Sequence, residues 1–399
     1  MQKPIPLQRP TSNVQPGLAE FALWRLGFRP FYLMAGIFAA LSVPLWVCQY
    51  AGYLPAAYLR GMVWHGHEML FGYALAVITG FLFTAVRNWT GRPTPTGAAL
   101  AGIAALWIAG RILVLTPYDV AAAVVNGAFP VAVAIGIGVP LVRSGNKRNY
   151  FFVVLLLMFG ALALALHLSY LRMMNWPELV SLQVGLDLVL LIIAAIGGRV
   201  IPMFTNNGVP GAGAASKLYV EKLALASIAV LGAADLLQAP GPVIAGVALV
   251  AAAVHGTRLY LWRFWRTLRT PLVWVLHGAY AWIVLHLVLR AMAASGLIGE
   301  PLAVHALTIG GIGGMTMGMM TRTSRGHTGR LLQAGWPEAT CFALVFCSAL
   351  VRVVGGILLP GIYMATVIVS GALWSAAFAL FAITYWPILT RARLDGKPG

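Results

Sequence analysis

The stretch WHGHEMLFGYALAVITGFLFTAV, residues 64–86, decides how the rest of the chain is interpreted. Beyond its first turn the stretch is apolar and close to the length of about 20 residues that a helix needs to cross a membrane core. The first turn itself carries His65, His67 and Glu68. Ionisable groups inside a span cost on the order of 2.5–3.5 kcal/mol on insertion scales, so a group of them usually marks a functional site. The stretch predicts a membrane helix that opens on such a site.

The composition extends the membrane prediction to the whole chain. Of 399 residues, 60% are hydrophobic and 9% charged, whereas soluble domains contain about 25% charged residues. Long unbroken Leu/Ala/Val runs favour helices over the alternating pattern of a membrane barrel. We therefore expect an all-α integral membrane protein with twelve transmembrane helices. The expected spans are 31–53, 62–86, 96–116, 120–142, 150–172, 179–202, 219–237, 240–260, 272–294, 301–321, 338–358 and 361–388.

The positions of the basic residues predict the orientation of these spans. With both termini in the cytoplasm, 22 of the 27 Lys and Arg residues fall at inner ends and five at outer ends. Cytoplasmic loops of membrane proteins carry such an excess. The net charge of +17 is thus a topology signal, and we expect no nucleic-acid partner. The outer five are Arg60, Arg111, Arg172, Arg290 and Arg352.

Short connections predict a single polytopic membrane domain over 1–399. It would consist of a cytoplasmic N-terminal segment at 1–30, a twelve-helix bundle at 31–388 and a cytoplasmic tail at 389–399. The polar first 25 residues predict no removable signal peptide. The three cysteines have no metal-like spacing and form no Cys-x-x-Cys-His motif, so any haem would be held noncovalently.

Five of the eight histidines fall in the outer half of the predicted bundle, on four different helices. Imidazole ligates haem iron and copper, and facing helices build metal sites in bundles. Each histidine taken alone also has an ordinary explanation, a hydrogen bond to a neighbouring helix. The clustering nevertheless makes all five metal-ligand candidates. They are His65, His67, His167, His286 and His305.

Helical periodicity divides the opening motif. Residues two apart lie about 200° apart around an α-helix, so His65 and His67 are expected to meet different partners. His65 and Glu68 share a face, and Glu68 is expected to accept the second ring N–H of His65 and fix its tautomer. The alternatives for Glu68 are a cap on the first turn, an ion pair with an outer arginine, or a role in proton transfer.

Two further features each have two interpretations. The glycines of the tenth predicted span either admit a neighbouring helix closely or leave room for a flat macrocycle. The outer arginines either extend to lipid headgroups or pair with haem propionates, whose carboxylates suit the guanidinium group. Arg60 and Arg290 are the propionate candidates.

Five blocks together resemble a known family. They are LGFRPFYL at 26–33, WHGHEMLFGYALAVITGFLFTAVRNWTGRP at 64–93, GGRVIPMFTNN at 197–207, LHGAYAW at 276–282 and HALTIGGIGGMTMGMMTRTSRGHTGR at 305–330. The chain resembles the NnrS family over these blocks, in order. That resemblance implies a twelve-helix protein of the bacterial inner (cytoplasmic) membrane that contains haem and copper and serves the response to nitric oxide and nitrosative stress. The matching positions include His65, His67, Glu68, Arg199, His277, His305, Arg322 and His327.

The expected cofactors are a noncovalent haem b and copper. His305 is the first candidate for an axial haem ligand, with His65 or His67 as the other axial ligand or as a copper ligand. His277, His286 and His167 are further copper candidates. The expected function is to bind nitric oxide or a related small ligand, or to process it by redox chemistry. The sequence leaves open whether the chain is a nitric oxide-directed oxidoreductase, which would need an electron donor that remains to be identified.

A secondary transporter for a metal or metal–nitrosyl species is the alternative function, because twelve spans are also common among carriers. Many carriers show internal repeats and broken helices near the midplane. We find no repeat between the two halves of the sequence, and this favours the haem and copper interpretation.

Overall fold

The computed structural model describes residues 21–50, 52–53 and 58–396. The first 20 residues of the N-terminal segment predicted at 1–30 lie outside this part. The described chain is built from helices, and its one β-type contact is an isolated bridge between Phe21 and Arg391. The prediction of an all-α protein is confirmed.

The helices of the described residues form twelve rods, where a rod is a helix that continues through any π-helical segment inside it. The first six are α1 (Phe28–Tyr50), α2 with η1 and α3 (Gly61–His67, Glu68–Ala74, Leu75–Thr90), α4 (Gly97–Leu113), α5 (Asp119–Arg143), α6 (Phe151–Tyr170) and α7 (Glu178–Gly208). The other six are α8 (Leu218–Leu236), α9 (Gly241–Leu261), α10 (Pro271–Ala294), α11 with η4 and α12 (Glu300–His305, Ala306–Gly313, Gly314–His327), α13 with η5 and α14 (Trp336–Leu350, Val351–Gly355, Gly356–Leu358), and α15 (Tyr363–Thr390). Three short 3-10 turns lie in the connections, η2 (Lys147–Asn149), η3 (Phe264–Arg266) and η6 (Pro360–Ile362).

Ten of these rods are long and apolar enough to cross a membrane. The other two are α4, which has 17 residues, and α8, which carries Glu221, Lys222 and Asp235. Each predicted span corresponds to one rod of the described chain. The chain is therefore a multi-pass membrane protein with about ten spans by length and composition.

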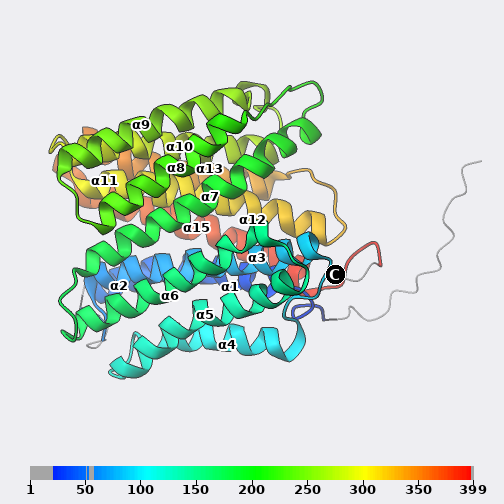
Figure 1. Cartoon of the computed structure of the whole chain (residues 1–399), viewed down its shortest axis with the longest axis horizontal. Helices are drawn as coiled ribbons and strands as arrows, with labels where there is room; N and C mark the ends of the chain where they lie inside the picture. The colour runs from blue at the N-terminus through cyan, green and yellow to red at the C-terminus, as the bar shows by residue number, and fades with distance from the viewer. Residues whose placement is uncertain (1–20, 51, 54–57, 397–399) are drawn as a thin grey trace, which may run out of the picture.

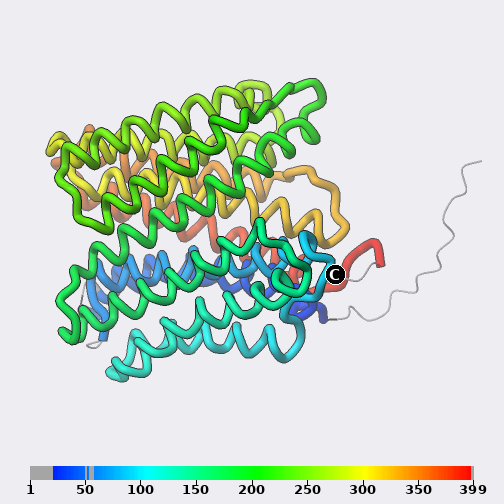
Figure 2. The backbone as a smooth tube through the Cα atoms, viewed as in Figure 1, coloured from blue at the N-terminus to red at the C-terminus, as the bar shows by residue number. Residues whose placement is uncertain are grey.

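The two described ends of the chain lie together. Ala22 donates its backbone N–H to the carbonyl oxygen of Thr390 at 2.7 Å, beside the Phe21–Arg391 bridge. Figure 1 shows this end of the bundle at the label C and the starts of α2 and α11 at the opposite end, which we call the distal end. The tube in Figure 2 runs from the blue and cyan rods through α7 to the green and yellow ones, and the last rod returns beside α1.

The most enclosed rods are those that carry the opening motif and the glycine-rich segment, Gly61–Thr90 and Glu300–His327. Both contain a π-helical segment, and so does the rod that begins at Trp336. A π-helical turn inserts one extra residue and re-aims the side chains around it, and such turns are frequent at functional sites.

Large side chains from neighbouring helices fill the glycine-rich face of η4 and α12. A Cβ atom added at Gly313 would lie 2.6 Å from the ring of Trp374, and one at Gly314 would lie 2.9 Å from the ring of Phe346. Trp282 covers Gly310 in the same way. Close helix packing is therefore the interpretation that holds for these glycines, and the face leaves no room for a macrocycle.

Gly313→Ala should destabilise the folded protein. Its methyl group would overlap the Trp374 ring in a packed region, and overpacking of this kind costs about 1–3 kcal/mol. The measurement is the midpoint of thermal unfolding in detergent. Gly246→Ala on α9 is the matched control, because a Cβ atom there meets nothing within 4 Å. Equal midpoints for the two variants would contradict this packing.

Candidate functional site

The first histidine pair of the distal end joins α2 to α11. The ring centroids of His65 and His305 are 6.5 Å apart and their planes differ by 16°. His305 Nδ1 donates to the carbonyl oxygen of Pro301 at 2.6 Å, which leaves its Nε2 with a lone pair. His65 lies against the ring of Trp46, and its buried Nδ1 has no hydrogen-bond partner. The structure thus brings His65 of α2 and His305 of α11 together.

The second pair joins the same turn to α6. His67 and His167 have ring centroids 4.9 Å apart and planes at 73°. Both rings are fully buried, and the Nε2 atoms of both have no hydrogen-bond partner. His65 and His67 thus face different histidines, as the helical periodicity predicts.

The Nδ1 atoms of this second pair are held by other side chains. Glu68 Oε1 lies 2.7 Å from His67 Nδ1, so a neutral His67 donates there and keeps the lone pair on Nε2. The Tyr58 hydroxyl lies 3.2 Å from His167 Nδ1 and donates to the His167 carbonyl oxygen at 3.4 Å. Burial raises the pKa of Tyr58 above its usual value, so this hydroxyl keeps its proton. Both rings are therefore set to present a free Nε2.

The partner of Glu68 differs from the expected one. Glu68 accepts from His67, whereas His65 Nδ1 is without a partner, so the expected hydrogen bond from His65 to Glu68 is wrong. The physical reason is local: a π-helical segment begins at Glu68, and the α-helical spacing of three residues no longer sets its direction. The expected second role of Glu68, an ion pair with an outer arginine, is present.

That arginine is Arg111 of α4. Its Nη1 lies 3.1 Å from Glu68 Oε1, and its Nη2 donates to the side chain of Asn126. Gly72 makes the approach possible, because a Cβ atom there would lie 2.6 Å from Arg111 Nη1. Glu68, at 1% exposure, therefore has one oxygen engaged by His67 and Arg111 and one, Oε2, without a hydrogen-bond partner.

A second buried arginine accompanies the first histidine pair. Arg352 lies in η5, acts electrostatically on both His65 and His305, and is 7% exposed. Its Nη2 donates to the Tyr363 hydroxyl at 2.7 Å, whereas its buried Nη1 has no hydrogen-bond partner. A guanidinium with one free N–H group beside two imidazoles is suited to an anionic group bound there.

The remaining predicted residues lie further from the two pairs or are engaged elsewhere. His286 Nδ1 donates to the Ala303 carbonyl oxygen at 2.7 Å, two residues before His305, and its Nε2 has no partner. His277 Nε2 lies 2.8 Å from the Thr205 hydroxyl. Arg60 is exposed at the start of α2, and Arg290 pairs with Asp235 and Glu300. The metal and propionate roles of these four residues stay predictions.

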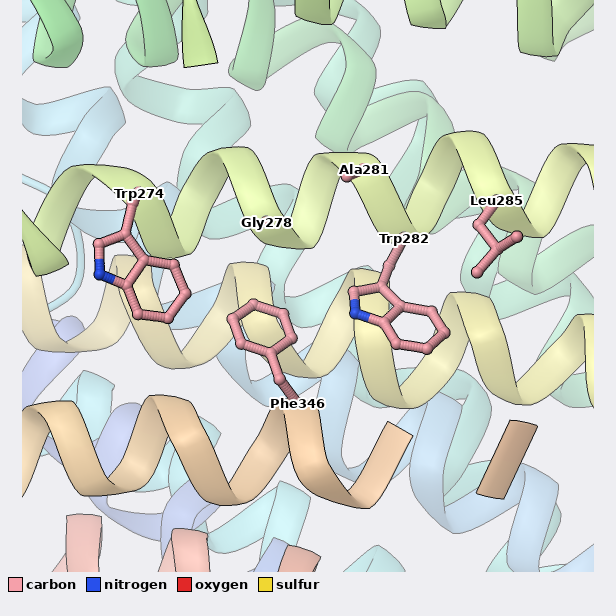
Figure 3. A pocket seen from close by; sticks show the side chains of 6 residues that line it. All are labelled: Trp274, Gly278, Ala281, Trp282, Leu285 and Phe346. Atoms are coloured by element: carbon pink, nitrogen blue, oxygen red, sulfur yellow. The ribbon is translucent and has the colours of Figure 1, made fainter. Parts of the chain in front are cut away.

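A hollow of about 300 Å³ lies on α10 and α13, apart from the histidines. Figure 3 shows the rings of Trp274 and Trp282 from α10 and of Phe346 from α13 along it. The other lining residues are Gly278, Ala281 and Leu285. This lining presents few polar atoms, which suits an acyl chain better than a charged substrate.

Each of the three π-helical segments of the described chain borders or contains a residue of this site. η1 begins at Glu68, η4 follows His305 directly, and η5 contains Arg352. The family model described as NnrS protein matches residues 22–393, which is nearly the whole described chain. The chain belongs to the NnrS family. A comparison with curated proteins gave no match.

Two of the five blocks that indicated the NnrS family contribute residues to this distal site. The block at 64–93 supplies His65, His67 and Glu68, and the block at 305–330 supplies His305. Sequence reasoning did not single out Tyr58, Arg111 or Arg352 as parts of the site. A charged residue within an apolar helix was the available signal for the two arginines, but lipid-facing arginines at helix ends give the same signal.

Proposed function

We propose that this NnrS family member is a haem and copper protein that binds nitric oxide or processes it by redox chemistry, and that it protects the cell against nitrosative stress. Family membership indicates a nitric oxide response protein. The observation that carries the proposal is that His65 and His67, on one turn of α2, each pair with a histidine of another helix. Each pair contains ring nitrogens that have no hydrogen-bond partner.

The spacing of each pair favours a different metal. Bonds of about 2 Å from nitrogen to metal on opposite sides of one ion separate the ring centroids by roughly 6 Å, and at a near-tetrahedral angle by roughly 5 Å. His65 and His305, with ring centroids 6.5 Å apart, would hold the haem. His67 and His167, with ring centroids 4.9 Å apart, would hold the copper ion.

We assign unequal roles to the two haem-binding histidines. His305 is held by the Pro301 carbonyl oxygen, and such a hydrogen bond orients a ligating imidazole and raises its basicity. His65 Nδ1 has no such partner, so His65 would hold the haem less firmly than His305. Arg352 would hold a propionate with its free Nη1. When bound, the haem would supply a ferrous iron that takes up nitric oxide, and the copper a second redox centre.

Glu68 and Arg111 have positioning roles in this proposal. Glu68 fixes the tautomer of His67, and Arg111 keeps the buried carboxylate ionised by pairing with it. The second, unpartnered oxygen of Glu68 is a group that can take up a proton if turnover occurs. Turnover also requires an electron donor.

We also propose that all twelve rods span the bacterial inner membrane, with both termini in the cytoplasm. α8 lies between α7 and α9, and α4 packs against α5, so both follow the course of the other rods. An even number of crossings agrees with the meeting of Ala22 and Thr390 at one end. The charge split of 22 to 5 supports a cytoplasmic location for that end.

The experiment that tests the function is optical spectroscopy of the purified full-length chain with haem and copper analysis. The reduced protein should show a Soret band that shifts when nitric oxide is added, and the shift should be complete once nitric oxide matches the haem content. Metal-replete protein without Soret absorbance would contradict the proposal. Haem-independent accumulation of a metal in proteoliposomes would favour the transporter alternative.

A further inference from the structure

A second buried polar cluster lies near the distal end, on helices α7, α8 and α10. Arg290 Nη2 donates to Asp235 Oδ1 at 2.6 Å, and its Nη1 donates to Gln183 Oε1 at 2.8 Å. The Gln183 amide in turn donates to Asp187 Oδ1 at 3.3 Å. The cluster connects two carboxylates through one guanidinium and one amide.

The two carboxylates also face each other. Asp187 lies against Gly232 of α8, where a Cβ atom would come within 3.2 Å of the Asp187 Cβ, and Asp235 is one turn further along that helix. Asp187 and Asp235 therefore lie on neighbouring turns of the packed helices α7 and α8. Asp187 is 3% exposed and Asp235 is 7% exposed, and Oδ2 of each has no hydrogen-bond partner.

The charges around this pair do not balance if both carboxylates are ionised. Arg290 pairs directly with Asp235 and reaches Asp187 through the Gln183 amide. Arg290 is also met by Glu300 of α11 at 3.1 Å, so its positive charge is shared by three carboxylates. His286, one turn before Arg290 on α10, donates to the Ala303 carbonyl oxygen and adds no negative charge. Two carboxylate charges on neighbouring turns in a membrane interior cannot both persist without compensation.

One shared proton accounts for both the unpartnered oxygens and the excess negative charge. A proton on Oδ2 of either aspartate makes that oxygen a donor to the other, which satisfies both unpartnered atoms and leaves one negative charge for Arg290. A metal ion of the calcium or magnesium type needs six or more oxygen ligands. Among the described residues there is no group of three or more His, Cys, Asp or Glu side chains placed to hold a metal.

We infer that Asp187 and Asp235 form a proton-binding site in which the two carboxylates share one proton. Arg290 connects the site to Glu300, whose side chain is 65% exposed at the distal end, so protons exchange with the solvent on that side. This site needs neither haem nor copper, and it adds a buried proton store to the distal half of the bundle.

Infrared difference spectroscopy of the purified full-length protein tests the inference. The wild type should show the C=O band of a protonated carboxylic acid that shifts in D₂O. Asp187→Asn and Asp235→Asn should each remove it. Glu300→Gln is the control and should retain the band, because the Glu300 side chain is 65% exposed.

A second measurement needs no variant. Alkaline titration of the wild type should remove the band. A wild-type protein without the band, or a band that both aspartate variants retain, would overturn the inference. A band that appears only when sodium is withdrawn would overturn it as well, since the pair would then be a cation site.

Discussion

His305→Ala should lower the haem content of the purified protein by at least about tenfold, whereas His65→Ala should keep most of its haem. Losing a group that only orients a metal ligand already costs about 10–100-fold in affinity, so losing the anchored ligand itself costs at least as much. His305 is anchored by the Pro301 carbonyl oxygen, and His65 is not. The measurement is haem per protein, from the pyridine haemochrome spectrum, together with the spin state of the ferric form.

His65→Ala has a distinct expected signature. The haem should change from a six-coordinate low-spin to a five-coordinate high-spin spectrum and bind nitric oxide faster than the wild type, because no ligand has to be displaced. His255→Ala is the matched control, since both ring nitrogens of His255 are engaged by Tyr280 and Ala224. Wild-type haem content and spectrum in His305→Ala would refute the assignment of His305.

Glu68→Gln should weaken copper binding by about 10–100-fold and leave the haem spectrum unchanged. The amide that replaces the carboxylate no longer fixes the His67 tautomer with Nε2 free. The change also leaves the Arg111 charge without its carboxylate, and breaking a buried pair costs about 3–5 kcal/mol, so copper affinity must be measured on folded protein.

Tyr58→Phe tests the same copper site without disturbing the ion pair. It removes only the hydroxyl next to His167 Nδ1, so we expect a smaller loss of copper affinity than in Glu68→Gln. Glu178→Gln at the start of α7 is the control for loss of a carboxylate. Copper affinity unchanged in both Glu68→Gln and Tyr58→Phe would show that copper, if present, binds elsewhere.

The apolar runs were sufficient to locate the helices, because a membrane core requires every span to satisfy its own backbone hydrogen bonds. The ends of the helices were harder to predict. The sixth span was expected at 179–202, but α7 continues from Glu178 to Gly208 through Pro202. Proline is tolerated inside membrane helices where neighbouring groups satisfy the freed carbonyl, so Pro202 did not end this one.

The residues of the site were only partly predictable from the sequence. Depth in the bundle brought His65 and His305 together, and α-helical periodicity separated His65 from His67. The α-helical periodicity predicted the wrong partner for Glu68, because a π-helical segment begins there and no sequence pattern indicates that segment. Arg111 is placed by a contact between helices far apart in the chain, which local sequence patterns do not specify. Arg352 donates to Tyr363, 11 residues further on, and no sequence pattern specifies that contact either.

The most direct test of two separate histidine pairs is the haem and copper content of His305→Ala and His167→Ala, measured side by side in folded, metal-replete protein. His305→Ala should lose haem and retain copper, and His167→Ala should lose copper and retain haem. Loss of both metals together in each folded variant, or of neither, would contradict the assignment of the two pairs to two different metals.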